Sequence, residues 1–138
     1  MSLPEQFEDG DKNYALITSC QKGCLFLVEY LVEQGADIHA EDEAALRWAS
    51  ASGHLPVVEY LVEHGANIHS CNDYSLRHGV ENNHLPVVKY LVEKGANIHF
   101  DNDYVFREAI NRGHKEIAEY LSSVGCKIEE EITDDFQI

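Results

Sequence analysis

Three blocks of eleven residues decide the fold of this chain: EYLVEQGADIH at 29–39, EYLVEHGANIH at 59–69 and KYLVEKGANIH at 89–99. Eight of the eleven positions are identical in all three blocks, which recur at a spacing of thirty residues. A fourth, diverged copy, EYLSSVGCKI, occupies 119–128. Self-similarity at a fixed period of roughly 20–50 residues is the signature of repeat proteins. The chain is therefore predicted to consist of four repeated units.

Each unit is predicted to contain two short helices, and the second unit shows why. The run at 44–51 is rich in helix formers, and Gly53 then ends the helix in the left-handed conformation that glycine favours. Pro56 suits the first position of the next helix, because its fixed φ matches that turn. The spacing of the following apolar residues predicts one buried stripe: Val57, Val58, Leu61 and Val62.

A polar connector follows each second helix, at 66–73 in the second unit, and is predicted to be a turn or tight hairpin. Two short helices cannot bury their apolar faces alone, so the units are expected to stack into a solenoid. The predicted units are about 13–42, 43–72, 73–102 and 103–128. Acidic tails are expected at 1–12 and 129–138.

This pattern resembles the ankyrin repeat. The resemblance rests on Gly-His pairs at 53–54 and 113–114, Val-Val at 57–58, and Gly-Ala turns at Gly35, Gly65 and Gly95. The usual repeat has about 33 residues and opens with Thr-Pro-Leu-His, whereas this one has thirty and opens, at 74–77, with Tyr-Ser-Leu-Arg. The shortened form resembles ankyrin repeats of giant amoebal viruses. The resemblance implies an all-α solenoid with shortened hairpin connectors and a non-enzymatic protein-binding role.

Charge and composition exclude several classes of function. The 25 Asp and Glu against 10 Lys and Arg give a net charge of −15, which argues against binding to nucleic acid or to anionic membranes. No apolar run reaches the ~20 residues of a membrane span, and the N-terminal residues do not resemble a signal peptide. We expect a monomeric cytoplasmic protein, in the host cytoplasm if it is viral. The cysteines form no Cys-x-x-Cys pair and are expected to be free thiols.

Six of the eight histidines follow the repeat. His54, His84 and His114 occupy the Gly-His turn, and the others lie in the connectors, at His39, His69 and His99. Equivalent atoms of stacked helices lie roughly 8–10 Å apart, too far for zinc, whose ligands lie about 2.0–2.1 Å away. We therefore expect structural histidines and no metal site. No catalytic or phosphate-binding motif occurs, so we expect no enzyme activity and no cofactor.

The connector histidines also suggest an alternative. By the same resemblance, ankyrin repeats carry an asparagine there that 2-oxoglutarate-dependent hydroxylases modify, aided by a leucine eight residues earlier. Leucines stand at that distance from the three histidines: Leu31, Leu61 and Leu91. Modification of the histidines is thus an alternative to a structural role, which we prefer.

Positions that vary between units are those that the scaffold does not dictate. By resemblance, ankyrin repeats bind proteins through a concave face made by the connectors and the exposed side of the first helices. The predicted contact residues are Trp48, His78, Glu81, Asn82, Phe100, Glu108, Asn111 and Arg112. Trp48 is either an interface anchor or a packing residue between units. We expect a protein partner with a basic patch. A ubiquitin-ligase adaptor is the alternative, although 128–138 is too short for an F-box-like segment.

Overall fold

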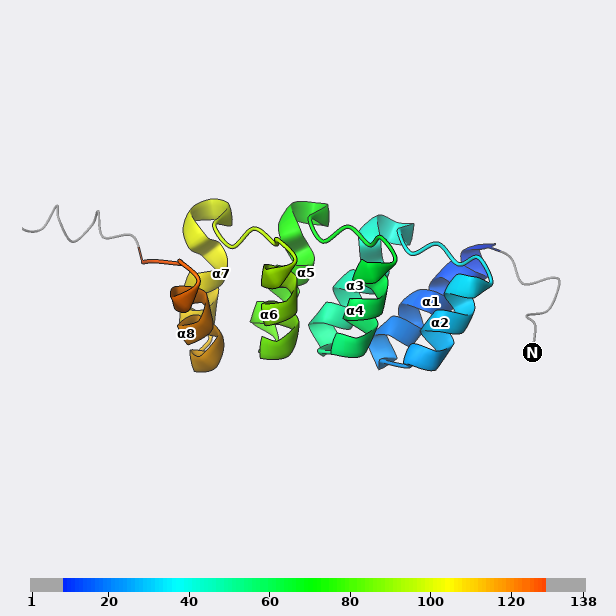
Figure 1. The fold of residues 1–138 in the computed structure, drawn as a ribbon, viewed down its shortest axis with the longest axis horizontal. Helices are drawn as coiled ribbons and strands as arrows, with labels where there is room; N and C mark the ends of the chain where they lie inside the picture. Colours follow the sequence, from blue (N-terminus) through cyan, green and yellow to red (C-terminus); the bar gives the residue numbers. More distant parts are fainter. Residues whose placement is uncertain (1–8, 129–138) are drawn as a thin grey trace, which may run out of the picture.

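The computed structural model describes residues 9–128, which fold into eight α-helices and contain no strand (Figure 1). Helices of odd number are the first helices of their units, and helices of even number are the second. Their bounds are α1 Asp9–Lys22, α2 Leu25–Glu33, α3 Ala40–Ser52, α4 Leu55–Glu63, α5 Ser70–Glu81, α6 Leu85–Glu93, α7 Phe100–Asn111 and α8 Lys115–Ser123. This confirms the predicted all-α fold of four helix-turn-helix units.

The helix ends follow the local signals in the sequence. Gly53, after α3, has φ 78°, and Asn83, at the equivalent position after α5, has φ 63°. Pro56 lies in the first turn of α4. Three residues of the predicted stripe of α4, Val57, Val58 and Leu61, are at most 1% exposed, whereas Val62 is only partly buried and packs at the edge of the core. Each fully buried side chain stabilises the fold by roughly 1.5–3 kcal/mol.

Figure 1 shows the four helix pairs side by side in one row, with the connectors along one edge. The first helices pack on one another more extensively than the second helices do. A single core runs through all four units. Its equivalent first-helix residues are Leu16, Leu46, Leu76 and Phe106, none more than 8% exposed. Burial therefore depends on stacking, since each unit covers the apolar face of its neighbour.

Each connector ends in a left-handed turn instead of a hairpin. Three successive residues have φ between 50° and 63° in each turn, namely 41–43, 71–73 and 101–103. Left-handed backbone costs an L-residue roughly 1–2 kcal/mol, so three in a row require compensating contacts. Of the two predicted forms of the connector, turn or tight hairpin, the structure contains the turn.

An arginine offsets the cost of each left-handed turn. In the third unit, Nη2 of Arg77 donates to the carbonyl oxygen of Cys71 at 2.9 Å, and Nε donates to that of Asn72 at 3.2 Å. Arg47 and Arg107 make the same pair of bonds in their units. The first unit has Ile17 at this position, and none of residues 11–13 has a positive φ. The left-handed turn thus occurs where the arginine can hold its carbonyl groups.

The ends of the solenoid differ from the predicted boundaries at one point. Helix α1 begins at Asp9, four residues before the predicted start of the first unit at residue 13. The rest of the predicted tails, 1–8 and 129–138, lies outside the described residues. None of the helices between residues 9 and 128 has the length and apolar character needed to cross a membrane.

Candidate protein-binding surface

The histidines of the Gly-His turns bind adjacent units together. Nε2 of each ring donates to a backbone carbonyl near the end of the preceding first helix, at 2.9–3.0 Å. The three bonds run from His54 to Gln21, from His84 to Ala51 and from His114 to Glu81. We call this set the histidine ladder. It confirms the predicted structural role and fixes the spacing of the first helices.

The connector histidines contribute a second tie between units. Nδ1 of His69 lies 3.0 Å from Oδ2 of Asp73, and that oxygen also accepts the backbone N–H of Asn97 in the next connector at 2.7 Å. His99 and Asp103 form the same pair at 2.7 Å. These carboxylates are therefore shared between their own histidine and the following connector, which holds the connectors in register.

Burial and hydrogen bonding shift the pKa of the Asp103 carboxyl group in opposite directions. Burial raises its pKa, but the backbone N–H of Lys127, at 2.9 Å, and the side chain of His99 stabilise the carboxylate. These bonds prevail, so the pKa of Asp103 lies below its ordinary value. The carboxylate is therefore the form that holds the last connector in place at neutral pH.

The second unit has Glu43 where the third and fourth units have aspartate and the first has Asn13. The hydrogen bond of Glu43 to His39 raises the pKa of that histidine. The other oxygen of Glu43, Oε2, is buried without a hydrogen-bond partner among the described residues. The longer side chain thus keeps the bond to its histidine while leaving one buried acceptor unused.

Partly buried aromatic rings and a guanidinium group lie in contact on the first helices. Cζ of Arg77 lies 4.3 Å from the ring centre of Tyr74 and 5.8 Å from that of Phe100. Tyr74 also contacts His78, with the ring centres 4.1 Å apart. We define the first-helix surface as the exposed and partly buried residues of α1, α3, α5 and α7, together with the left-handed turns that open the last three of these helices and the residues that directly follow each helix. Its central part is a row of aromatic and arginine side chains in mutual contact.

The structure places all eight predicted contact residues on the first helices or at their ends, and none is buried. Those at the helix ends fall into two groups. Phe100 is the first residue of α7 and lies beside the left-handed turns, whereas Asn82, Asn111 and Arg112 lie at the opposite helix ends. The right-handed part of α5, which follows its left-handed turn, has eight residues at 74–81 and is about 12 Å long. One small ligand would not contact both groups, but a protein surface would.

Trp48 is the most conspicuous member of the set, because its side chain is 46% exposed. The equivalent positions hold Thr18, His78 and Glu108. The stack therefore does not require an aromatic ring at this position. The exposure leaves about half of the largest apolar side chain in the chain open to a partner.

Several side chains of this surface were missed by sequence reasoning. Tyr74 and the three arginines of the turns were seen only as part of the opening of each unit, although their recurrence every thirty residues was the available signal. All four arginines of the chain belong to this surface and are engaged within it. Arg112 pairs with Glu108, and the other three bind turn carbonyls.

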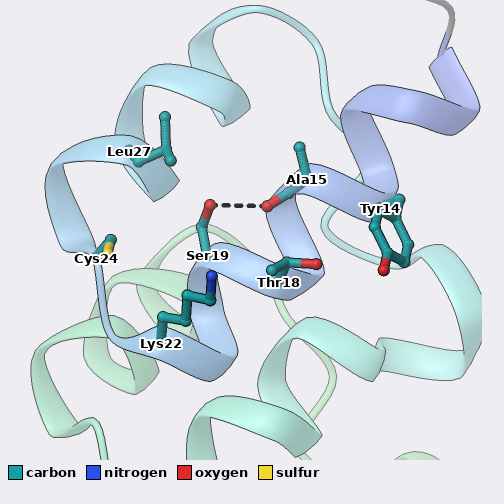
Figure 2. A pocket seen from close by; sticks show the side chains of 7 residues that line it. All are labelled: Tyr14, Ala15, Thr18, Ser19, Lys22, Cys24 and Leu27. Atoms are coloured by element: carbon teal, nitrogen blue, oxygen red, sulfur yellow. Dashed lines mark hydrogen bonds between the residues drawn. The ribbon is translucent and has the colours of Figure 1, made fainter.

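A shallow apolar hollow lies at the outer face of the first unit (Figure 2). Its lining residues are Tyr14, Ala15, Thr18, Ser19, Lys22, Cys24 and Leu27. Figure 2 also shows the hydroxyl of Ser19 donating to the carbonyl oxygen of Ala15, at 2.7 Å. Leu27 is 41% exposed, while its equivalents Val57, Val87 and Ile117 are buried by the preceding unit. The hollow is the part of the repeat surface that a preceding unit covers elsewhere in the stack.

All four cysteines are free thiols, as predicted. Burial raises the pKa of Cys20 to about 12, and burial together with Asp103 raises that of Cys126 to about 11. Both thiols are therefore poor nucleophiles at neutral pH. Within residues 9–128, one group combines three metal-ligating side chains, namely His99, Asp103 and Cys126. Sequence reasoning missed it, because only equivalent histidines of successive units were compared.

Repeated helix pairs stacked through one core and joined by short turns define a helical-repeat solenoid. A family model described as ankyrin repeats in three copies matches residues 3–72, and a model of the single ankyrin repeat matches residues 76–103. The chain belongs to the ankyrin-repeat family. Ankyrin repeats are non-enzymatic modules for protein–protein interaction, which agrees with the predicted class of function.

Proposed function

We propose that this chain binds a protein partner through the first-helix surface, the concave face of the predicted solenoid. The exposure of Trp48, at a position where other units carry threonine, histidine or glutamate, is the observation that supports this most directly. Tryptophan, tyrosine and arginine are the residues most enriched at binding hot spots. The same surface carries Tyr74 and Arg77 beside Phe100.

The contacts already present in the free protein favour binding. Arg77 is held by two turn carbonyls and lies against two aromatic rings, so its side chain is ordered before a partner arrives. Ordering a long side chain on binding costs about 0.5–1.5 kcal/mol. A surface that is already ordered avoids much of this cost.

Electrostatics favours a partner with a basic patch. The net charge is −15, and the arginines of the first-helix surface are bound to the chain's own carbonyl groups or to Glu108. Glu41 and Asp42 are exposed in the left-handed turn that opens α3, the helix of Trp48. Opposite charges raise the association rate more than the affinity. Association should therefore slow markedly in added salt, since the screening length is only about 8 Å at physiological ionic strength.

The thirty-residue period and the opening Asp-Tyr-Ser-Leu-Arg at 73–77 support a viral setting. In this proposal the chain is a protein of a giant amoebal virus that acts as a monomer in the host cytoplasm on a host or viral protein. An adaptor role, recruiting a substrate to a ubiquitin ligase, is a special case of the same binding activity. It would be recognised by a ligase subunit in the captured complex.

The test compares two variants on opposite sides of the stack. Wild type, Trp48→Ala and Glu63→Ala are used as baits in amoebal lysate, and the captured protein is then purified for binding measurements. Trp48→Ala should weaken the complex by at least ~2 kcal/mol if it is a hot spot, with unchanged helical content. Glu63 is exposed on α4, a second helix, and its variant should bind like wild type. Loss of binding for Glu63→Ala with normal binding for Trp48→Ala would place the interface on the other side and refute the proposal.

A further inference from the structure

We propose that a zinc ion binds where the third and fourth units meet, between His99, Asp103 and Cys126. A ring nitrogen of the histidine, a carboxylate oxygen of the aspartate and the thiol sulfur all lie within 4.8 Å of one another. Imidazole, carboxylate and thiolate are the three ligand types that zinc takes from proteins. A site with three protein ligands leaves the fourth tetrahedral position to water.

The fold holds the three groups together from separate elements. His99 precedes α7, Asp103 ends the left-handed turn and Cys126 follows α8. The carboxylate is fixed by the backbone N–H of Lys127 at 2.9 Å, and the thiol lies 3.7 Å from the carbonyl oxygen of Ile98. The histidine ring also faces the Gly-Cys turn, since its Cε1 and Nε2 lie 4.0 Å from where a Cβ on Gly125 would be.

The other units of the chain are natural references for this site. The pair of histidine and carboxylate recurs at His69 and Asp73, so two of the three ligands belong to the repeat itself. The position of the thiol holds alanine in the other units, at Ala36, Ala66 and Ala96. Cys126 is 2% exposed and takes the buried place of that alanine. Only the last unit therefore has the third ligand.

The geometry requires a modest adjustment to accept the ion. With metal–ligand bonds of about 2.0–2.3 Å, ligand atoms around tetrahedral zinc lie roughly 3.4–3.7 Å apart. The 2.7 Å contact between His99 and Asp103 must therefore lengthen, while the group as a whole contracts from its 4.8 Å spread. The side chain of His99 is 59% exposed and free to make this movement. The thiol loses its proton to solvent when the metal–sulfur bond forms.

Cobalt(II) is the probe for the site, because its bond to a thiolate produces a charge-transfer absorption in the near ultraviolet. The reduced, metal-free chain should develop this band and lose it on addition of Zn²⁺. Zn²⁺ should also raise the melting temperature, by about 5 °C or more at saturation. Cys126→Ala restores the alanine of the other units and is expected to fold. It should show no band, no thermal shift and an affinity for Zn²⁺ lower by more than about tenfold.

Two further variants test whether the cobalt band arises from the proposed site. Cys71→Ala removes an exposed thiol elsewhere and should leave the band unchanged. Ala96→Cys places a thiol beside His69 and Asp73, and should raise the cobalt stoichiometry from one to two per chain. The proposal is overturned if the wild type develops no band, if the band survives in Cys126→Ala, or if it disappears in Cys71→Ala.

Discussion

Replacing Gly53 with alanine tests whether the histidine ladder is as rigid as its hydrogen bonds suggest. Gly53 has φ 78°, and a Cβ there would lie 2.4 Å from Nδ1 and 2.7 Å from Cε1 of His84. Cβ atoms do not approach ring atoms so closely, so the ring must move. That movement would strain the bond from its Nε2 to the carbonyl oxygen of Ala51, now 2.9 Å.

The expected loss has two parts that the chain allows us to separate. Left-handed backbone costs alanine roughly 1–2 kcal/mol relative to glycine, and crowding in a packed site costs about 1–3 kcal/mol. Gly53→Ala should therefore lower the free energy of unfolding by about 2–5 kcal/mol. Gly113 has φ 75°, but a Cβ there would meet nothing within 4 Å. Gly113→Ala should lower the free energy of unfolding only by the backbone cost, roughly 1–2 kcal/mol.

Urea unfolding followed by far-ultraviolet circular dichroism measures both losses. In the double variant Gly53→Ala with His84→Ala, the free energy of unfolding should fall by less than the sum of the losses in the two single variants, because removal of the ring relieves the crowding. Asn83 has the equivalent position with φ 63°, and His114 keeps its bond to the carbonyl oxygen of Glu81 at 3.0 Å, so the third unit accommodates a side chain there. If Gly53→Ala and Gly113→Ala proved equally destabilising, the ring would be free to move and the ladder would not be rigid.

Three further outcomes follow from the core, the turns and the connectors. Leu61→Ala should lower the free energy of unfolding by roughly 2–5 kcal/mol. Leu121 is equally buried, but Leu121→Ala should lower the free energy of unfolding by less, because the last unit has only one neighbour. Equal losses of stability in a denaturant series would contradict this. Arg77→Leu removes two charged hydrogen bonds from an exposed turn and should cost about 1–3 kcal/mol; an unchanged urea midpoint would show that these bonds contribute nothing. The hydrogen bond to Glu43 raises the pKa of His39, so its contribution to stability is complete below 6.5 and is lost as pH rises through the folded value. The melting temperature should fall over that window less in His39→Gln than in wild type, and parallel curves would refute the assignment.

The fold could be predicted because its signals are local and repeated. Glycine or asparagine after a first helix, proline in the next turn and an apolar stripe at helical spacing each specify one element, and the period of thirty specifies the stack. The left-handed turns could not be predicted in the same way. Cys71 does not favour that backbone by itself, and Asn72 and Asp73 adopt it as single residues but not in a run of three. The turn depends on a guanidinium group that reaches back from the following helix.

The position of the interface stays a prediction, but the structure shows where its proposed residues lie. Variation between units correctly selected residues that are not buried, including Trp48 and Phe100. It could not select Tyr74 or Arg77, because variation ignores residues that serve the scaffold and the surface together. It also passed over Cys126, whose neighbours in space come from the preceding connector. Contacts between units depend on how the units stack, and a comparison of aligned positions gives no information about that geometry.

The short period and the proposed binding surface have a common physical origin. A left-handed turn of three residues takes the place of the paired strands of a hairpin, and so allows a unit shorter than the usual 33 residues. Its backbone cost must be offset, and arginine offsets it with two hydrogen bonds. The guanidinium group that holds the turn then lies over Tyr74 and Phe100, where it fixes the rings of the proposed interface. Loss of Arg77 should therefore weaken partner binding as well as stability, and a variant that lost stability alone would separate the two roles.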